Sequence, residues 1–345
     1  MSRAAEDVVT KRVFERVSQI DEQKLQDFHV TLLPDFFLDH IITAGGFSDT
    51  MERLRKLYSQ GGGNLPMNKQ LVLSGGKAAN TAKALARLGV SAHFIGKTSM
   101  VGFELLKFFL GKNGVDISRV KTSGKLATTV ALEFEGRNVM LSDAGSVEAY
   151  SFDCLDEKDL EVIASSDIVC VTNWTLNKKG TELAEKVFSF AKKNGVVTFF
   201  DSGDPSSREE DVTVLFKKVV SNSNLDIFSL NENELRYFTK VSATDKAAVI
   251  SAAQSLQDKI TARVDLHTSR FSYSNGTIVD SFDVPMVGVS TGAGDAWNAG
   301  NIFGELLHFR DDERLLFANA VAAYYISHVP PVHPNLKNIV AFLLQ

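Results

Sequence analysis

From about residue 155 onward, the chain alternates between short apolar segments and longer segments with helical spacing. Strands are predicted at 167–172, 196–201, 226–230 and 264–268, and helices at 155–163, 178–193, 232–238 and 246–259. Repeated strand–helix units form a mostly parallel sheet with helices on both faces. Ligands of such sheets bind in a crevice at the carboxyl ends of the strands. The sequence therefore predicts an α/β fold with its functional site along that edge.

The N-terminal part departs from this alternation. Residues 1–28 are predicted to form a helical extension, because Val8, Val13 and Val17 recur at helical spacing among charged residues. The next segment, 30–42, is predicted to be one buried strand interrupted by Pro34. A short helix is predicted at 48–58. Residues 29–345 are expected to form a single domain.

Composition excludes several classes of protein. The formal net charge is -5 and no basic cluster is present, which argues against a nucleic-acid partner. No apolar run reaches transmembrane length and no signal peptide is recognisable, so no membrane partner and a cytoplasmic location are expected. Cys154 and Cys170 have no metal-binding or redox spacing.

The most informative motif is Gly292-Ala293-Gly294-Asp295, between an extended segment and a predicted helix. The free N–H groups at a helix N-terminus attract anions. Asp295 places a carboxylate at this anion-binding position. Aspartate is also common in first helical turns for reasons of the helix dipole alone. With the small residues before it, however, the motif suits phosphoryl transfer, with a phosphate cradle and a base for the attacking hydroxyl.

Two further motifs follow predicted strands. Gly75-Gly76-Lys77, with Asn80 one turn later, lets the backbone approach a ligand and offers polar contacts, although a simple turn before a helix would look the same. Asn231 and Glu234 either form a capping box or orient waters on Mg²⁺.

Three acidic residues also lie at the ends of predicted strands. Asp39 follows an apolar run and needs a partner, either sugar hydroxyls or an internal hydrogen bond. Asp201 and Asp204 are interpreted as turn-forming or supporting residues, and His267 and the other histidines as structural.

Together these motifs resemble the ribokinase-like (PfkB) carbohydrate kinase family. The segment from Ser74 to Gly89 is similar to its N-terminal signature, and Ser290 to Asp295 to its C-terminal signature. Asn231 to Glu234 and Asp39 match two further elements in the family's order. The resemblance implies a three-layer α/β/α fold with a small lid, whose elements are expected within 41–72 and 113–145.

The resemblance also implies roles for individual residues. Asp295 would be the catalytic base, beside an anion hole formed by Gly292, Ala293 and Gly294. Acceptor binding is expected from a second set: Asp39, Gly75, Gly76 and Asn80. Nucleotide binding is expected from a third: Lys77, Asn231, Thr268 and Asn319. Asn231 and Glu234 would act near Mg²⁺.

Three features depart from the family pattern. Ser290 replaces the aspartate that helps hold a monovalent cation in cation-dependent members, so activity indifferent to K⁺ is expected. The loop 268–271 lacks the family's glycine. The predicted helix at 48–58 indicates an atypical lid.

We therefore expect an ATP-dependent kinase that phosphorylates a hydroxyl of a small sugar or sugar-like acceptor. A nucleoside kinase of the same fold is an alternative, because Phe36, Phe37 and Trp174 could stack on a base. A non-catalytic ligand-binding or regulatory member of the fold is another. The sequence indicates no oligomer interface, so a homodimer is left open.

Overall fold

The computed structural model describes residues 3–67, 69–135, 137–242, 245–284 and 291–344. Ser290, on which the expectation about K⁺ depends, lies outside these residues.

The core of the fold is an eight-stranded sheet in the order β14-β13-β12-β11-β10-β9-β1-β4. All of its strands are parallel except β13, which runs antiparallel to both neighbours. Their bounds are β1 (His29–Leu33), β4 (Ser91–Phe94), β9 (Ile168–Thr172), β10 (Val197–Asp201), β11 (Ile227–Asn231), β12 (Arg263–His267), β13 (Phe271–Ser274) and β14 (Thr277–Asp280). The predicted mostly parallel sheet is confirmed.

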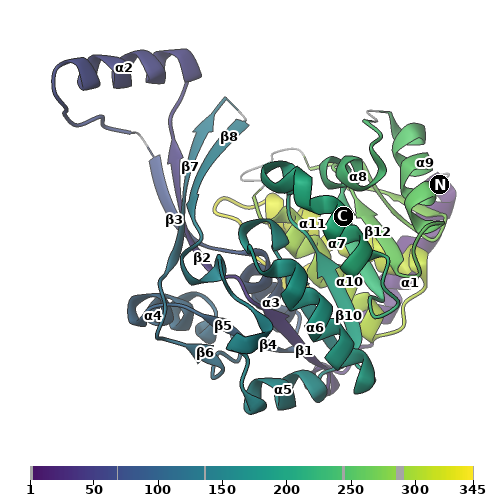
Figure 1. Ribbon diagram of the computed structural model, residues 1–345. Coiled ribbons are helices and arrows are strands. Elements are labelled where there is room, and N and C mark those ends of the chain that lie inside the picture. Colours follow the sequence, from purple (N-terminus) through teal and green to yellow (C-terminus); the bar gives the residue numbers. More distant parts are fainter. Residues whose placement is uncertain (1–2, 68, 136, 243–244, 285–290, 345) are drawn as a thin grey trace.

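Helices cover both faces of this sheet and make three layers (Figure 1). Successive side chains of a strand point to opposite faces of the sheet, so each face carries its own apolar cluster. In β9, Ile168 and Cys170 belong to the first cluster, and Val169 and Val171 belong to the second. The helices that contribute residues to the first cluster are α1 (Arg3–Ser18), α3 (Lys77–Arg87), α4 (Met100–Phe109), α10 (Ala293–Leu306), α11 (Asp311–Ile326) and α12 (Leu336–Leu343). The helices that contribute residues to the second cluster are α5 (Glu157–Ala164), α6 (Gly180–Lys193), α7 (Val212–Leu215), α8 (Glu232–Thr239) and α9 (Lys246–Gln257).

A second, four-stranded sheet stands to one side of the main sheet as a lid (Figure 1). Its order is β3-β2-β7-β8, with bounds β2 (Phe37–Thr43), β3 (Lys69–Gly75), β7 (Ala127–Phe134) and β8 (Arg137–Asp143). The helix predicted at 48–58 is α2 (Phe47–Ser59), which lies at the far end of the lid. α2 thus lies in the connection between β2 and β3 and replaces neither of these lid strands. A third, two-stranded pair joins β5 (Gly96–Lys97) and β6 (Val120–Lys121).

The prediction of one interrupted strand over 30–42 is wrong. The segment forms β1 in the main sheet and β2 in the lid, so the chain changes sheets between Leu33 and Phe37. Apolar patterning alone does not reveal this change, because both strands are mostly apolar and only three residues separate them.

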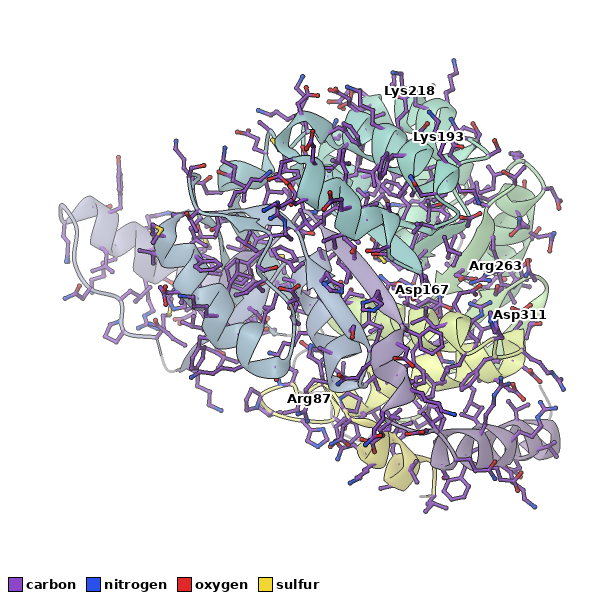
Figure 2. The ribbon with its side chains drawn as sticks, turned by 90° about the horizontal axis from the view of Figure 1, so that it is seen from below. Arg87, Asp167, Lys193, Lys218, Arg263 and Asp311 are labelled. Atoms are coloured by element: carbon purple, nitrogen blue, oxygen red, sulfur yellow. The ribbon has the colours of Figure 1, made fainter. Side chains whose placement is uncertain are left out.

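The N-terminal helix α1 packs beside the C-terminal helices, as the view from below shows (Figure 2). Val9, Val13 and Val17 are buried on its inner side. Arg12 and Arg16 reach the first turn of α11, where Arg16 Nη1 lies 2.9 Å from Glu313 Oε2. The described part of the chain contains no helix long and apolar enough to cross a membrane.

Asp35 lies at the point where the chain leaves the main sheet, and it is completely buried. Its carboxylate accepts the backbone N–H groups of Lys77 and Ala78, at 2.7 and 3.0 Å, in the first turn of α3. It also accepts the Thr172 hydroxyl at 2.9 Å and the Asn173 amide at 2.8 Å, at the end of β9. One carboxylate therefore fixes α3 against the carboxyl ends of β1 and β9.

We predict that Asp35→Ala destabilises the chain by about 3–5 kcal/mol, because it leaves several buried donors without an acceptor. Urea unfolding measures the loss. Asp49→Ala, on the exposed face of α2, is the control and is expected to change stability by less than about 0.5 kcal/mol. Equal stability of the two variants would contradict the role given to Asp35.

Candidate active site

A cleft lies where the lid meets the carboxyl ends of the main sheet, with a volume of about 1110 Å³. Sites for one small ligand usually have roughly 300–1,000 Å³, so this cleft has room for two ligands at once. Most predicted site residues line it: Asp39, Gly76, Lys77, Asn80, Asn231, Thr268, Gly292, Ala293, Gly294, Asp295 and Asn319. Gly75 and Glu234 lie behind the lining.

Asp295 is in the first turn of α10 and only 6% exposed. Its Oδ2 accepts the Asn80 amide at 2.9 Å. Burial raises the pKa of Asp295 to about 8, although the Lys77 ammonium lowers it. A carboxylate with this pKa is matched to proton transfer near neutral pH.

The turn before Asp295 leaves the first N–H groups of α10 without intrahelical partners. Gly292 adopts φ +88°, in the left-handed region, and a β-carbon there would lie 2.6 Å from the Tyr325 hydroxyl. Tyr325 donates to the Thr291 carbonyl at 3.1 Å and supports the turn from α11. Glycine is thus required at 292 by conformation and by space.

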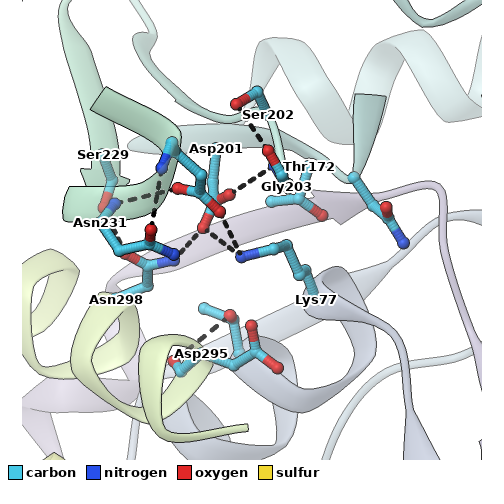
Figure 3. Close-up of polar contacts among 12 residues, drawn as sticks. Lys77, Thr172, Asp201, Ser202, Gly203, Ser229, Asn231, Asp295 and Asn298 are labelled. Carbon is cyan, nitrogen blue, oxygen red and sulfur yellow. Dashed lines mark hydrogen bonds and ion pairs between the residues drawn. The ribbon is translucent and has the colours of Figure 1, made fainter. Parts of the chain in front are cut away.

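Lys77 is the cation of the cleft. Its Nζ lies 3.0 Å from Asp201 Oδ2 and 3.8 Å from Glu234 Oε1. Burial opposes the charge on Lys77, but Asp201, Glu234 and Asp295 outweigh it and raise the pKa of Lys77. Figure 3 shows Lys77 and Asn298 converging on Asp201, which the Asn298 amide contacts at 2.7 Å. Asp201 therefore positions Lys77, in agreement with the supporting role expected from the sequence.

Asn231 and Glu234 form the capping box that the sequence allowed. Asn231 Oδ1 accepts two N–H groups of α8, and Glu234 accepts the Asn231 N–H at 2.9 Å. Glu234 is 2% exposed, and burial raises its pKa to about 7. Among the described residues, no group of three or more His, Cys, Asp or Glu could hold a metal ion by itself.

Asp39 reaches the cleft from the lid strand β2. Burial raises its pKa to about 6, while a hydrogen bond from Thr129 lowers it. A β-carbon at Gly75 would lie 2.2 Å from the Asp39 carboxylate, and one at Gly76 would lie 2.6 Å from the Asp35 carbonyl. The absence of a side chain at Gly75 thus makes room for the Asp39 carboxylate, and at Gly76 for the Asp35 backbone.

The remaining predicted nucleotide residues have side chains that are already engaged. The Thr268 hydroxyl donates to the Phe271 carbonyl at 2.8 Å and closes the loop after β12. The side-chain Oδ1 of Asn319 accepts the Trp297 indole N–H at 2.8 Å. The side-chain Nδ2 of Asn319 donates to the backbone carbonyl of Asp280 at 3.1 Å. Both residues line the cleft, but their clearest contacts hold its wall together.

Sequence reasoning missed the parts played by Asp35, Asn173 and Asn298. An acid at the end of the first strand was the only available signal, and it does not identify partners 42 and 137 residues away. The proposed base-stacking role of Trp174 is wrong, because its ring is fully buried and covered by the Arg208 guanidinium. Phe36 lies in the core, whereas Phe37 lines the cleft.

Comparison with known proteins finds similarity along most of the chain. A model described as "pfkB family carbohydrate kinase" matches residues 55–337. The chain is 27% identical to the ribokinase of Haemophilus influenzae over 312 residues, which covers 86% of this chain and 92% of that protein.

Solved structures show the same fold. A ribokinase of Arabidopsis thaliana complexed with ribose and ATP superposes with a TM-score of 0.71 at 19% identity, covering 92% of this chain and 98% of that one. A putative ribokinase II of Escherichia coli in complex with ATP and Mg²⁺ gives 0.70 at 18% identity, covering 92% and 99%. The predicted ribokinase-like α/β fold with a small lid sheet is confirmed.

We predict that Asp295→Asn makes the folded chain more stable than the parent at pH 9 but not at pH 4. The pKa of Asp295 is about 8 in the folded chain and ordinarily 3.8, so the folded state binds this proton more tightly. The stability that the proton contributes is complete below pH 3.8 and is lost as pH rises through 8.

Thermal unfolding of both proteins from pH 4 to 9 tests this prediction. The difference in Tm is expected to widen up to about pH 8 and then stay constant. A difference that does not change with pH would mean that Asp295 titrates normally.

Proposed function

The chain belongs to the pfkB family of ATP-dependent carbohydrate kinases, and we propose that it transfers the γ-phosphoryl group of ATP to a hydroxyl of a small sugar or sugar-like acceptor. The observation that carries this proposal is the position of Asp295. Asp295 lies in the first turn of α10, where the backbone N–H groups lack intrahelical partners, and it lines a cleft that also contains Lys77. Phosphoryl transfer to a hydroxyl requires both parts, a base for the hydroxyl proton and donors for the negative charge of the transferred group.

The acceptor hydroxyl gives its proton to the Asp295 carboxylate as its oxygen attacks the γ-phosphorus. The new O–P bond forms while the bond between the γ-phosphorus and the β,γ-bridging oxygen breaks, and ADP leaves with that oxygen. The N–H groups of Gly292, Ala293 and Gly294 hold the negative charge of the group being transferred. Lys77, fixed by Asp201, adds positive charge beside it.

The two ends of the cleft suit two different ligands. At the lid end, Asp39 and Asn80 supply hydrogen-bonding groups for several hydroxyls, and Gly75 and Gly76 keep the backbone close. Ala322 and Ile326 of α11 line the cleft with apolar side chains, and with Asn319 they would form the wall for adenine. Asn231 and Thr268 also line the cleft, and the phosphates would run past them.

Mg²⁺ carried by the nucleotide would meet Asn231 and Glu234 at the end of β11. Mg²⁺ keeps most of its water ligands and needs few protein oxygens. Asn231 lines the cleft and would orient such waters, whereas Glu234, behind the lining, would hold Asn231 in place through the capping box. When bound, the ion neutralises phosphate charge. The E. coli structure contains ATP and Mg²⁺ together, which supports a Mg²⁺-bound nucleotide as a ligand of this fold.

The proposal is tested by incubating the purified chain with ATP, Mg²⁺ and a panel of pentoses, hexoses, sugar acids and nucleosides. Acceptor-dependent ADP release with at least one sugar, and a new phosphomonoester signal in ³¹P NMR, are expected. Turnover with nucleosides alone would favour the nucleoside kinase. Nucleotide binding without turnover of any acceptor would favour the non-catalytic alternative.

We predict that Asp295→Asn lowers kcat by about 10²–10⁴-fold, the usual contribution of a general base. The substitution keeps the shape of the side chain, so nucleotide and acceptor affinities, measured by calorimetry, are expected to change little. Asp49→Asn on α2 is the matched control and is expected to retain full activity. A variant that retains more than roughly a tenth of the parent kcat would exclude Asp295 as the base.

We also predict that Asp39→Ala lowers kcat/KM for the acceptor by at least about tenfold, because hydrogen bonds between a carboxylate and hydroxyls are lost. The affinity for ADP is the internal control and is expected to stay the same. Unchanged acceptor kinetics with a lowered Tm would show that Asp39 serves the lid structure only.

A further inference from the structure

His267 is the last residue of β12, and it is the neighbour of Asn231 across the parallel strands. Its ring stacks on the Trp297 indole, with the centroids 4.8 Å apart and the planes at 24°. Trp297 is in turn fixed by the hydrogen bond from its Nε1 to Asn319. The imidazole is therefore held rigidly in the wall of the cleft, and it is 9% exposed.

The two ring nitrogens of His267 have different surroundings. Nδ1 is buried and has no hydrogen-bond partner among the residues that the structure describes. Nε2 is directed at Gly294: a β-carbon placed there would lie 3.0 Å from Nε2 but 3.8 Å or more from the nearest ring carbons. Glycine at 294 thus lets the first turn of α10 pack closely against Nε2, because a β-carbon there would crowd the ring.

This difference favours one tautomer. A buried N–H without an acceptor is rarer in folded proteins than a buried acceptor without a donor. The single proton of the neutral ring therefore belongs on Nε2, where a ligand or water can accept it. Burial lowers the pKa of His267 to about 4, although Asp201 raises it, so the ring is neutral at pH 7.

We propose that His267 is a phosphate-binding residue, whose Nε2–H donates to an oxygen of the α- or β-phosphate of the nucleotide. This inference rests on the proposed kinase function. Nε2 lies beside the anion-binding turn at Gly294, whereas the stack on Trp297 leads away from it to Asn319 at the adenine end. A group between these two points faces the phosphates that remain on ADP. It also supplies a side-chain donor directly before the loop 268–271, which has no glycine.

Two substitutions separate the donor from the ring. His267→Phe keeps a flat ring to stack on Trp297 but has no N–H, whereas His267→Gln has a donor that reaches the position of Nε2. Calorimetry with ADP and with adenosine is the measurement, and circular dichroism checks folding. For His267→Phe the Kd of ADP is expected to rise at least about tenfold and that of adenosine less than about threefold. For His267→Gln most of the ADP affinity is expected to return.

His93→Gln is the matched control, because it removes an imidazole at the far edge of the sheet, and unchanged ADP affinity is expected. Equal ADP binding by His267→Phe and the parent, or equal losses in the Phe and Gln variants, would overturn the inference. These experiments need no turnover. If the parent bound ADP but phosphorylated nothing, the proposed function would fail while the test of His267 stood.

The unmodified chain provides a second readout if the variants do not fold. In ¹H–¹⁵N NMR of the histidine side chains, His267 is expected to be protonated at Nε2, and its signal to shift with ADP but not with adenosine. A ring protonated at Nδ1, or a signal that does not respond to ADP, would contradict the proposal.

Discussion

The buried carboxylate of Asp35 is the contact on which the rest of the site depends. A parallel sheet brings the ends of β1, β9 and β10 to one edge, but it does not by itself place a helix there. Asp35 does so by accepting two N–H groups of α3 and two side-chain donors from the end of β9. From that fixed helix, Lys77 reaches Asp201 and Asn80 reaches Asp295. Five segments far apart in the sequence are thereby held together beside one cleft.

The charges in this cleft are unbalanced in a way that serves the chemistry. Three buried carboxylates, Asp201, Glu234 and Asp295, share one ammonium, that of Lys77. Asp201 lies within contact of Lys77, and its pKa is lowered by that ammonium against the effect of burial. For Asp295 the Lys77 ammonium does not offset the effect of burial, and burial raises its pKa to about 8. One carboxylate thus stays ionised to hold the cation, and the other is able to exchange a proton near neutral pH.

The sequence was sufficient for what depends on local pattern. Strand–helix alternation predicted the parallel sheet, and helical spacing predicted α2 within one residue at each end. Gly292 to Asp295 identified the turn at which α10 begins. Contacts between distant segments were not predictable. The split of 30–42 into strands of two sheets, the partners of Asp35 and the stack of His267 on Trp297 depend on which segments the fold brings together. No local spacing records these pairings.

The central claim is that Asp295 removes the proton of the acceptor hydroxyl from within this cleft. The most direct measurement is kcat/KM for the acceptor as a function of pH, from 5 to 10, at saturating ATP and Mg²⁺. Because the carboxylate must be ionised to act as a base, kcat/KM is predicted to rise about tenfold per pH unit and to level off near pH 8, the pKa of Asp295. A profile that is flat between pH 5 and 9 would contradict the claim.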